Sequence, residues 1–218
     1  MNNSMTTFFW LTIFGITMGY FESAVVVYLR AIYYPEGFTF PLRAMTDQKI
    51  AVEIFREAAS IIMLLSVAAL AGRKFRERFA YFIFSFGIWD IFYYVWLKLL
   101  LGWPVTFVDW DVLFLIPLPW IGPVIAPLSI AVLMLIGSVL IINSLERGFE
   151  FKPTGTAWLL GLAATAIILY SFMYDTEATL HQQMPKPYKY ELLIIGNLLY
   201  IGAFVLPYVK GRITARRP

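Results

Sequence analysis

The sequence contains no cysteine and one histidine. Without cysteine the chain forms no disulfide, no thiolate zinc site, no cysteine-ligated iron–sulfur cluster and no c-type haem attachment. A single histidine excludes a bis-histidine haem held by this chain alone. Charged residues are scarce too, at 14% of the chain, where soluble domains carry about 25%. No cofactor is therefore predicted, and the few charges that are present need an explanation.

Apolar residues are abundant instead. They supply 60% of the 218 residues and give a mean hydropathy of +0.72. Several runs approach or exceed the ~20 apolar residues needed to cross a bilayer. No polar block is long enough to form a separate soluble domain. The composition predicts an all-α integral membrane protein, with residues 1–218 forming a single polytopic membrane domain.

Six apolar runs predict about six transmembrane helices. They cover approximately Phe8–Leu29, Lys49–Gly72, Phe79–Leu101, Pro123–Asn143, Thr156–Tyr174 and Leu192–Val209. Prolines recur between the third and fourth runs, and proline disrupts a continuous helix. The segment from about Gly102 to Gly122 is therefore predicted to be interfacial or re-entrant.

The first run carries small residues at every fourth position, Gly15, Gly19 and Ser23. Such a face lets a second helix approach closely. Glu22 lies at the border of this face, so we expect it to point into the bundle.

Basic residues are more frequent on one side of the predicted spans. With both termini cytoplasmic, the inner side carries Arg73, Lys74, Arg76, Arg78, Arg147, Lys152, Lys210, Arg212, Arg216 and Arg217. The outer side carries only Arg30, Arg43, Lys49, Lys186 and Lys189. This bias predicts a multi-pass protein of the inner (cytoplasmic) membrane with both termini in the cytoplasm. The basic tail with Arg212, Arg216 and Arg217 is predicted to bind lipid headgroups.

The second run contains charges that hydrocarbon does not tolerate well. Glu53, Arg56, Glu57 and Ser60 follow one another at i, i+3, i+4 and i+7, which places them on one helical face. An ionisable side chain in hydrocarbon costs roughly 2.5–3.5 kcal/mol even on the lenient insertion scale. This face is therefore expected to point to protein or water.

The third run also concentrates its polar groups, with Asp90, Tyr94 and Lys98 at i, i+4 and i+8. At ~1.5 Å of rise per residue, Glu22 and Glu57 come out on the order of 12 Å below the outer surface and Asp90 on the order of 16 Å. Similar depth predicts one buried polar cluster, in which Arg56 pairs with at least one of these acids. Its members are Glu22, Glu53, Arg56, Glu57, Asp90, Tyr94 and Lys98. Outer-loop polar candidates above it are Asp109, Asp111, Glu177 and His181.

Two interpretations of the cluster stay open. Buried charges often pair with one another and simply fix helix packing. The acids outnumber the bases, however, and carboxylates crowded in a low dielectric do not all ionise, so at least one is expected to hold a proton at about pH 7. Glu177 and His181 lie at i, i+4 near Asp175, but a lone histidine in a polar loop is more often solvated, and no metal site is predicted.

Two function classes follow. The first, preferred from the sequence, is a non-catalytic helical subunit of a larger inner-membrane complex, with the lipid bilayer and other membrane subunits as partners and no nucleic acid. The second is a proton-coupled transporter or proton-relay protein using Glu22, Glu57 and Asp90. A membrane-embedded enzyme at the same residues is a variant of the second, although the sequence has no phosphate loop, nucleophile elbow or zincin helix.

Overall fold

A computed structural model describes residues 3–43, 46–148 and 151–214 of the chain. The structure is mostly helical, and within the described residues six helices are long and apolar enough to cross a membrane. These are α1 (Asn3–Tyr33), α2 (Asp47–Ala71), α3 (Phe75–Leu101), α4 (Ile125–Glu146), α5 (Gly155–Met173) with the short α6 (Thr176–Leu180), and α7 (Tyr190–Thr214). Each predicted apolar run corresponds to one of these helices.

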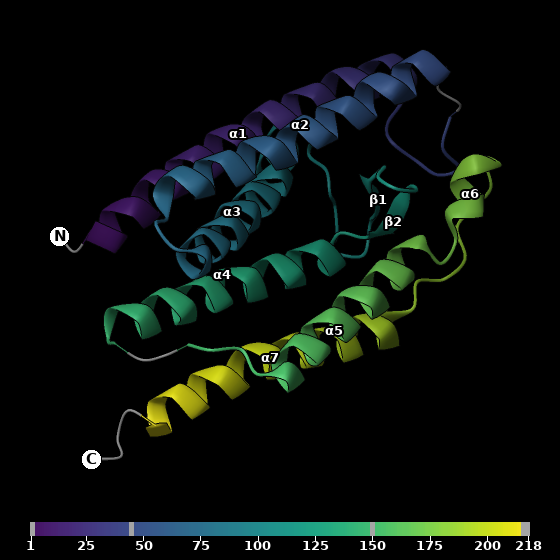
Figure 1. The fold of residues 1–218 in the computed structure, drawn as a ribbon. Helices are drawn as coiled ribbons and strands as arrows, with labels where there is room; N and C mark the ends of the chain where they lie inside the picture. The colour runs from purple at the N-terminus through teal and green to yellow at the C-terminus, as the bar shows by residue number, and fades with distance from the viewer. Residues whose placement is uncertain (1–2, 44–45, 149–150, 215–218) are drawn as a thin grey trace.

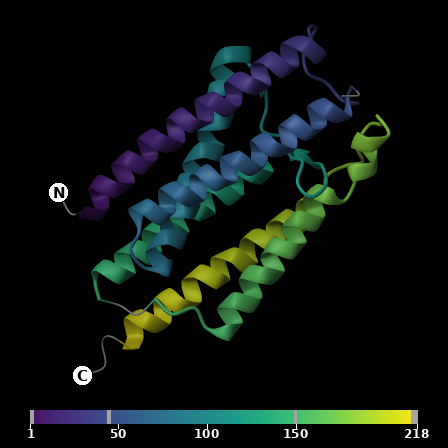
Figure 2. The ribbon, with the colours of Figure 1, turned by 45° about the horizontal axis from the view of Figure 1, so that its top comes forward.

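The helices run back and forth along one direction, so that the two ends of the bundle carry different connections (Figure 1). The N- and C-termini lie at the same end in both ribbon views, as an even number of crossings requires (Figure 2). The opposite end carries the α1–α2 connection, the two strands and α6 (Figure 1). We call this second end the loop end.

Each of the six helices extends at one or both ends beyond the apolar run that predicted it. Helix α1, for example, begins at Asn3 and continues to Tyr33, whereas the prediction ended at Leu29. Hydropathy marks the hydrocarbon layer only, while backbone hydrogen bonds continue a helix into the interface. The prediction that a loop begins at Arg30 is therefore wrong, because Arg30 lies in the last turn of α1.

Helices α1 and α3 pack closely along the small-residue face. A Cβ atom added to Gly19 would lie 3.1 Å from both the Trp89 carbonyl oxygen and the Tyr93 backbone nitrogen. One turn further on, the Ser23 hydroxyl donates a hydrogen bond to the Tyr93 carbonyl oxygen at 2.9 Å. The predicted close approach is confirmed, and α3 is the partner. This contact places α3, with Asp90 and Tyr93, against α1.

The proline-rich segment contains a β-hairpin that the sequence analysis did not predict. Strand β1 (Trp110–Phe114) pairs antiparallel with β2 (Trp120–Pro123), and the turn between them holds two of the prolines. Proline has no backbone N–H, so a turn accommodates it without the loss of a ladder hydrogen bond. The turn is tied to the end of α5, where the Thr176 hydroxyl donates to the Pro119 carbonyl oxygen at 3.1 Å. The segment is non-helical, as its prolines predicted, but its interfacial or re-entrant position stays a prediction, and the all-α description omits the two strands.

Candidate functional site

A cavity of about 420 Å³ lies inside the half of the bundle nearest the loop end. Small-molecule sites measure roughly 300–1,000 Å³, so this cavity has room for a ligand. All six long apolar helices, α1, α2, α3, α4, α5 and α7, contribute to its wall, together with the hairpin. The polar side chains come mainly from α1, α2, α3 and β1, whereas α4 and α5 contribute mainly apolar ones.

Arg56 holds the polar wall together between α1 and α2. Its Nε donates to Glu53 Oε2 at 2.8 Å, and its Nη1 forms an ion pair with Glu22. Glu22 also accepts a hydrogen bond from the Ser60 hydroxyl. Only 7% of Glu22 and of Glu53 is exposed. The sequence predicted that Arg56 pairs with an acid of the cluster, and the structure has this pair with Glu22.

Glu57 connects the polar wall to the hairpin. Its Oε2 accepts the backbone N–H of Leu115, directly after β1, at 2.8 Å. Glu57 is buried and makes no ion pair with any residue that the structure describes. A buried carboxylate with a single neutral donor is weakly stabilised in its charged form. The α2 face thus presents two different carboxylate environments, one paired with arginine and one held by the backbone.

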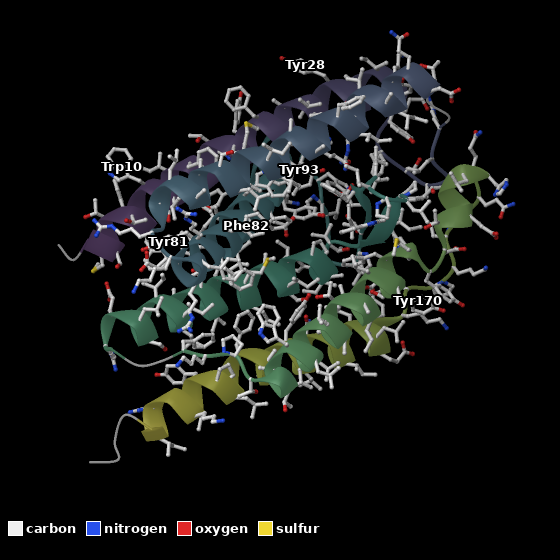
Figure 3. All side chains as sticks on the ribbon, viewed as in Figure 1. Trp10, Tyr28, Tyr81, Phe82, Tyr93 and Tyr170 are labelled. Carbon is white, nitrogen blue, oxygen red and sulfur yellow. The ribbon has the colours of Figure 1, made fainter. Side chains whose placement is uncertain are left out.

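Asp90 lines the cavity from the middle of α3. Within residues 3–43, 46–148 and 151–214, its carboxylate forms no hydrogen bond and no ion pair. Tyr93 lines the same wall, and its hydroxyl donates to Asp111 Oδ2 at 3.4 Å. In Figure 3 Tyr93 lies in the interior of the bundle, whereas Trp10 and Tyr28 face away from it on α1. Because the Asp90 carboxylate has no partner among the described residues, it is free to bind a proton or a ligand.

Arg30 and Asp111 form a second buried ion pair, which the sequence analysis did not find. Arg30 Nη2 lies 3.1 Å from Asp111 Oδ1, and only 2% of Asp111 is exposed. The guanidinium also lies over two rings, with Cζ 3.8 Å from the Trp103 ring centroid and 4.1 Å from that of Phe38. Burial raises the pKa of Asp111 to about 6, although Arg30 opposes this shift. Asp111 was predicted as an outer-loop candidate above the cluster; it lies on β1, in the connection between α3 and α4, and it also lines the cavity.

Lys98 does not belong to the cluster, contrary to the prediction. It is exposed near the end of α3, and its Nζ donates to the carbonyl oxygens of Gly102 and Pro104, at 3.1 and 2.7 Å. Gly102 is the C-cap residue of α3 and Pro104 lies in the loop that follows it, so Lys98 ties this loop to the end of the helix. Tyr94 does line the cavity, as its spacing from Asp90 predicted.

Three of the outer-loop candidates lie away from the cavity. Asp109 is bound within its own loop, where it accepts the backbone N–H of Val105 at 2.7 Å. Glu177 and His181 are both exposed, and Nδ1 of the His181 ring lies 3.2 Å from the Glu177 backbone oxygen. Within the described part of the chain, no group of three His, Asp or Glu side chains could hold a metal ion.

The predicted headgroup-binding arginines are only partly described. Arg212 is exposed near the end of α7, at the end of the bundle that carries the termini. Arg216 and Arg217 lie outside the described residues.

The cavity wall as a whole carries more acidic than basic side chains. Its acids are Glu22, Glu53, Glu57, Asp90 and Asp111, and its arginines are Arg30, Arg43 and Arg56. No protein-family model, curated protein or solved structure matches this chain. Closely spaced carboxylates in a low dielectric do not all ionise, so at least one carboxylate of the wall is expected to hold a proton.

Proposed function

We propose that this chain is a proton-relay membrane protein of the transporter class, in which carboxylates of the cavity take up and release protons. One observation carries the proposal: Asp90 lines a cavity of about 420 Å³ within the span and has no partner among the described residues. Ionisable groups that lie inside membrane spans without a structural partner commonly mark ion or proton pathways.

The contacts rank the acids that the sequence suggested for this role. Glu22 is engaged by both Arg56 and Ser60, which favours a fixed charge with a structural role. Glu57 has one backbone donor, and Asp90 has none within the described residues. We assign proton uptake to Asp90, with Glu57 as the neighbouring site.

We further propose that both termini are cytoplasmic and that the protein lies in the inner membrane. The excess of basic residues at the end of the bundle that carries the termini supports this orientation. A reporter fusion at Lys74 is expected to report cytoplasm, and one at Gln182 the opposite side. The reverse pattern would contradict the proposed orientation.

The hairpin is proposed to lie at the outer interface of the membrane. Trp103, Trp110 and Trp120 lie in or next to it, and tryptophan is enriched at the headgroup level. Strand edges and irregular backbone are tolerated near membrane depth only where protein or water covers them, and the hairpin is covered by α5 and by Glu57.

Proton movement through the purified protein tests the functional proposal. Vesicles containing the protein and a trapped pH-sensitive dye are exposed to an imposed membrane potential, and the rate of internal acidification is measured. The wild type is expected to exceed empty vesicles, and Asp90→Asn to lower the protein-dependent rate by at least about tenfold, because a positioned proton carrier typically contributes that much or more. The variant should fold, since the Asp90 carboxylate makes no hydrogen bond or ion pair with the described residues.

Asp47→Asn is the matched control. Asp47 is exposed in the first turn of α2 and does not line the cavity, so its neutralisation should leave the rate unchanged. Equal rates for wild type and Asp90→Asn, at equal folded yield, would contradict the proposal.

The non-catalytic subunit of a larger complex stays a prediction from the sequence. Mild detergent extraction distinguishes this prediction from the proposed proton relay. Co-migration with stoichiometric partners, together with vesicles as proton-tight as empty ones, would favour the subunit. A lone, monodisperse protein with Asp90-dependent proton movement would favour the relay.

A further inference from the structure

The charges on the cavity wall are not balanced. Arg56 is matched by Glu22 and Glu53, and Arg30 by Asp111. Glu57 and Asp90 have no ion-pair partner among the described residues. An anionic ligand would add to the negative charge of these carboxylates, whereas a cationic ligand would neutralise it.

The remaining arginine of the wall does not supply the missing charge. Arg43 is exposed in the α1–α2 connection, with its guanidinium 5.6 Å from the Tyr34 ring centroid. Its charge is therefore in contact with solvent, where Coulomb interactions are weak. The wall around Asp90 stays acidic despite it.

Aromatic rings line the same cavity as the unpaired carboxylate. Phe86, Trp89, Tyr93 and Tyr94 occupy positions i−4, i−1, i+3 and i+4 from Asp90 on α3, and all line the cavity. On the other side, the rings of Trp120 and Phe172 also line it and stack with centroids 6.0 Å apart. Aromatic faces attract a cation that lies within about 6 Å of the ring centroid. A carboxylate among aromatic rings is the combination that binds organic ammonium and related cations.

The side of the cavity formed by α4 and α5 determines which substituents a bound cation can have. Helices α4 and α5 contribute mainly apolar side chains, among them Ile130, Met134 and Ile168. Among the described residues, the one hydroxyl that they contribute to the wall, that of Thr165, is already hydrogen-bonded to Gly161 and Tyr200. Burying apolar substituents against the apolar side chains is favourable, because it removes apolar surface from water. A small hydrated cation would gain nothing there.

We infer that the cavity binds a hydrophobic organic cation, with its positive group at Asp90 and its apolar substituents against α4 and α5. The inference rests on the proposed proton relay and names its substrate class. The proton and the cation compete for one carboxylate, so the cation binds as the proton leaves and the site's charge is conserved. Proton binding and cation binding at Asp90 are therefore mutually exclusive, and each lowers the affinity for the other.

Other groups face Asp90 across the cavity and enter its pH dependence. The charged or titratable side chains of the wall are Glu22, Arg30 and Tyr33 from α1, Tyr34 and Arg43 from the α1–α2 connection, Glu53, Arg56 and Glu57 from α2, Tyr93 and Tyr94 from α3, Asp111 from β1 and Tyr200 from α7. Helices α4 and α5 contribute none to the wall. Because Arg30 and Arg56 are engaged by other acids, Asp90 is the carboxylate most available to a cation.

Binding of two ions of equal shape and opposite charge tests the inference. Tetraphenylphosphonium and tetraphenylborate are titrated onto the detergent-purified full chain, and binding is followed by calorimetry. The cation is expected to bind at least about tenfold more tightly than the anion, a difference of about 1.4 kcal/mol. Equal binding of the two ions, or tighter binding of the anion, would overturn the inference even if no variant could be purified.

The pH dependence and two variants complete the test. Below the pH at which the Asp90 carboxylate titrates, each further decrease of one pH unit should raise the Kd of tetraphenylphosphonium about tenfold. In the same pH range, binding of the cation should release protons into a weakly buffered solution. Asp90→Asn should weaken cation binding at least tenfold, whereas Asp47→Asn should not change it. Unchanged binding by folded Asp90→Asn would place the cation elsewhere and overturn the assignment.

The failure of this inference is distinguishable from the failure of the proposed function. If tetraphenylphosphonium does not bind but Asp90-dependent proton movement persists, the ligand class is wrong and the relay stands. If it binds with no proton release and no pH dependence, the competition is wrong and so is the relay at this residue.

Discussion

Arg56→Ala is expected to reduce the free energy of unfolding by about 3–5 kcal/mol, the usual cost of removing one partner from a buried ion pair. Arg56 pairs with Glu22 and Glu53, which belong to different helices, and both acids are buried. Without the guanidinium, two carboxylates lie in a low dielectric with no opposite charge. The measurement is the yield of monodisperse protein and its Tm in detergent.

Two further variants distinguish a lost pair from general damage. Arg212→Ala removes an exposed arginine at the other end of the bundle, so its effect should stay within about 0.5 kcal/mol. Glu22→Gln introduced beside Arg56→Ala removes one of the stranded charges and should recover part of the loss. If Arg56→Ala were as stable as Arg212→Ala, the buried pairs would have no role in folding.

Gly19→Val is the second substitution with a large expected effect. The added Cβ would lie 3.1 Å from backbone atoms of Trp89 and Tyr93, and these cannot move aside unless α3 moves with them. Overpacking of this kind typically lowers the free energy of unfolding by about 1–3 kcal/mol. Valine adds two further methyl groups, so we expect a loss at the upper end of this range. Because α3 also carries Asp90, proton movement should fall together with the Tm.

The matched control compares two helical glycines. At Gly161 on α5, an added Cβ would meet only the Ala203 Cβ, at 3.9 Å, which is ordinary contact. Gly161→Ala should therefore be neutral or slightly stabilising, because glycine costs a helix about 0.5–1 kcal/mol relative to alanine. Gly19→Ala should lower the Tm instead. The same small effect at both positions would contradict the close approach of α1 and α3.

Asp90 and Lys98 show where helical spacing predicts the position of a side chain and where it does not. Their spacing placed both on the polar face of α3, and Asp90 does line the cavity. Lys98 lies within one turn of the helix end, where its ammonium donates to the carbonyl groups of Gly102 and Pro104 instead. A regular spacing describes a helix interior, but the end of a helix imposes hydrogen-bonding demands of its own.

The sequence by itself determined the six long apolar helices and the faces that carry charge or small residues, because each depends on hydropathy and helical period within one continuous segment. The partner of the Gly15–Gly19 face, the Arg30–Asp111 pair and the contact between Glu57 and Leu115 join segments far apart in the chain. Local sequence does not set how two helices are rotated against each other or which strands pair. Only the tertiary structure decided these contacts, and with them the cavity that brings the carboxylates together.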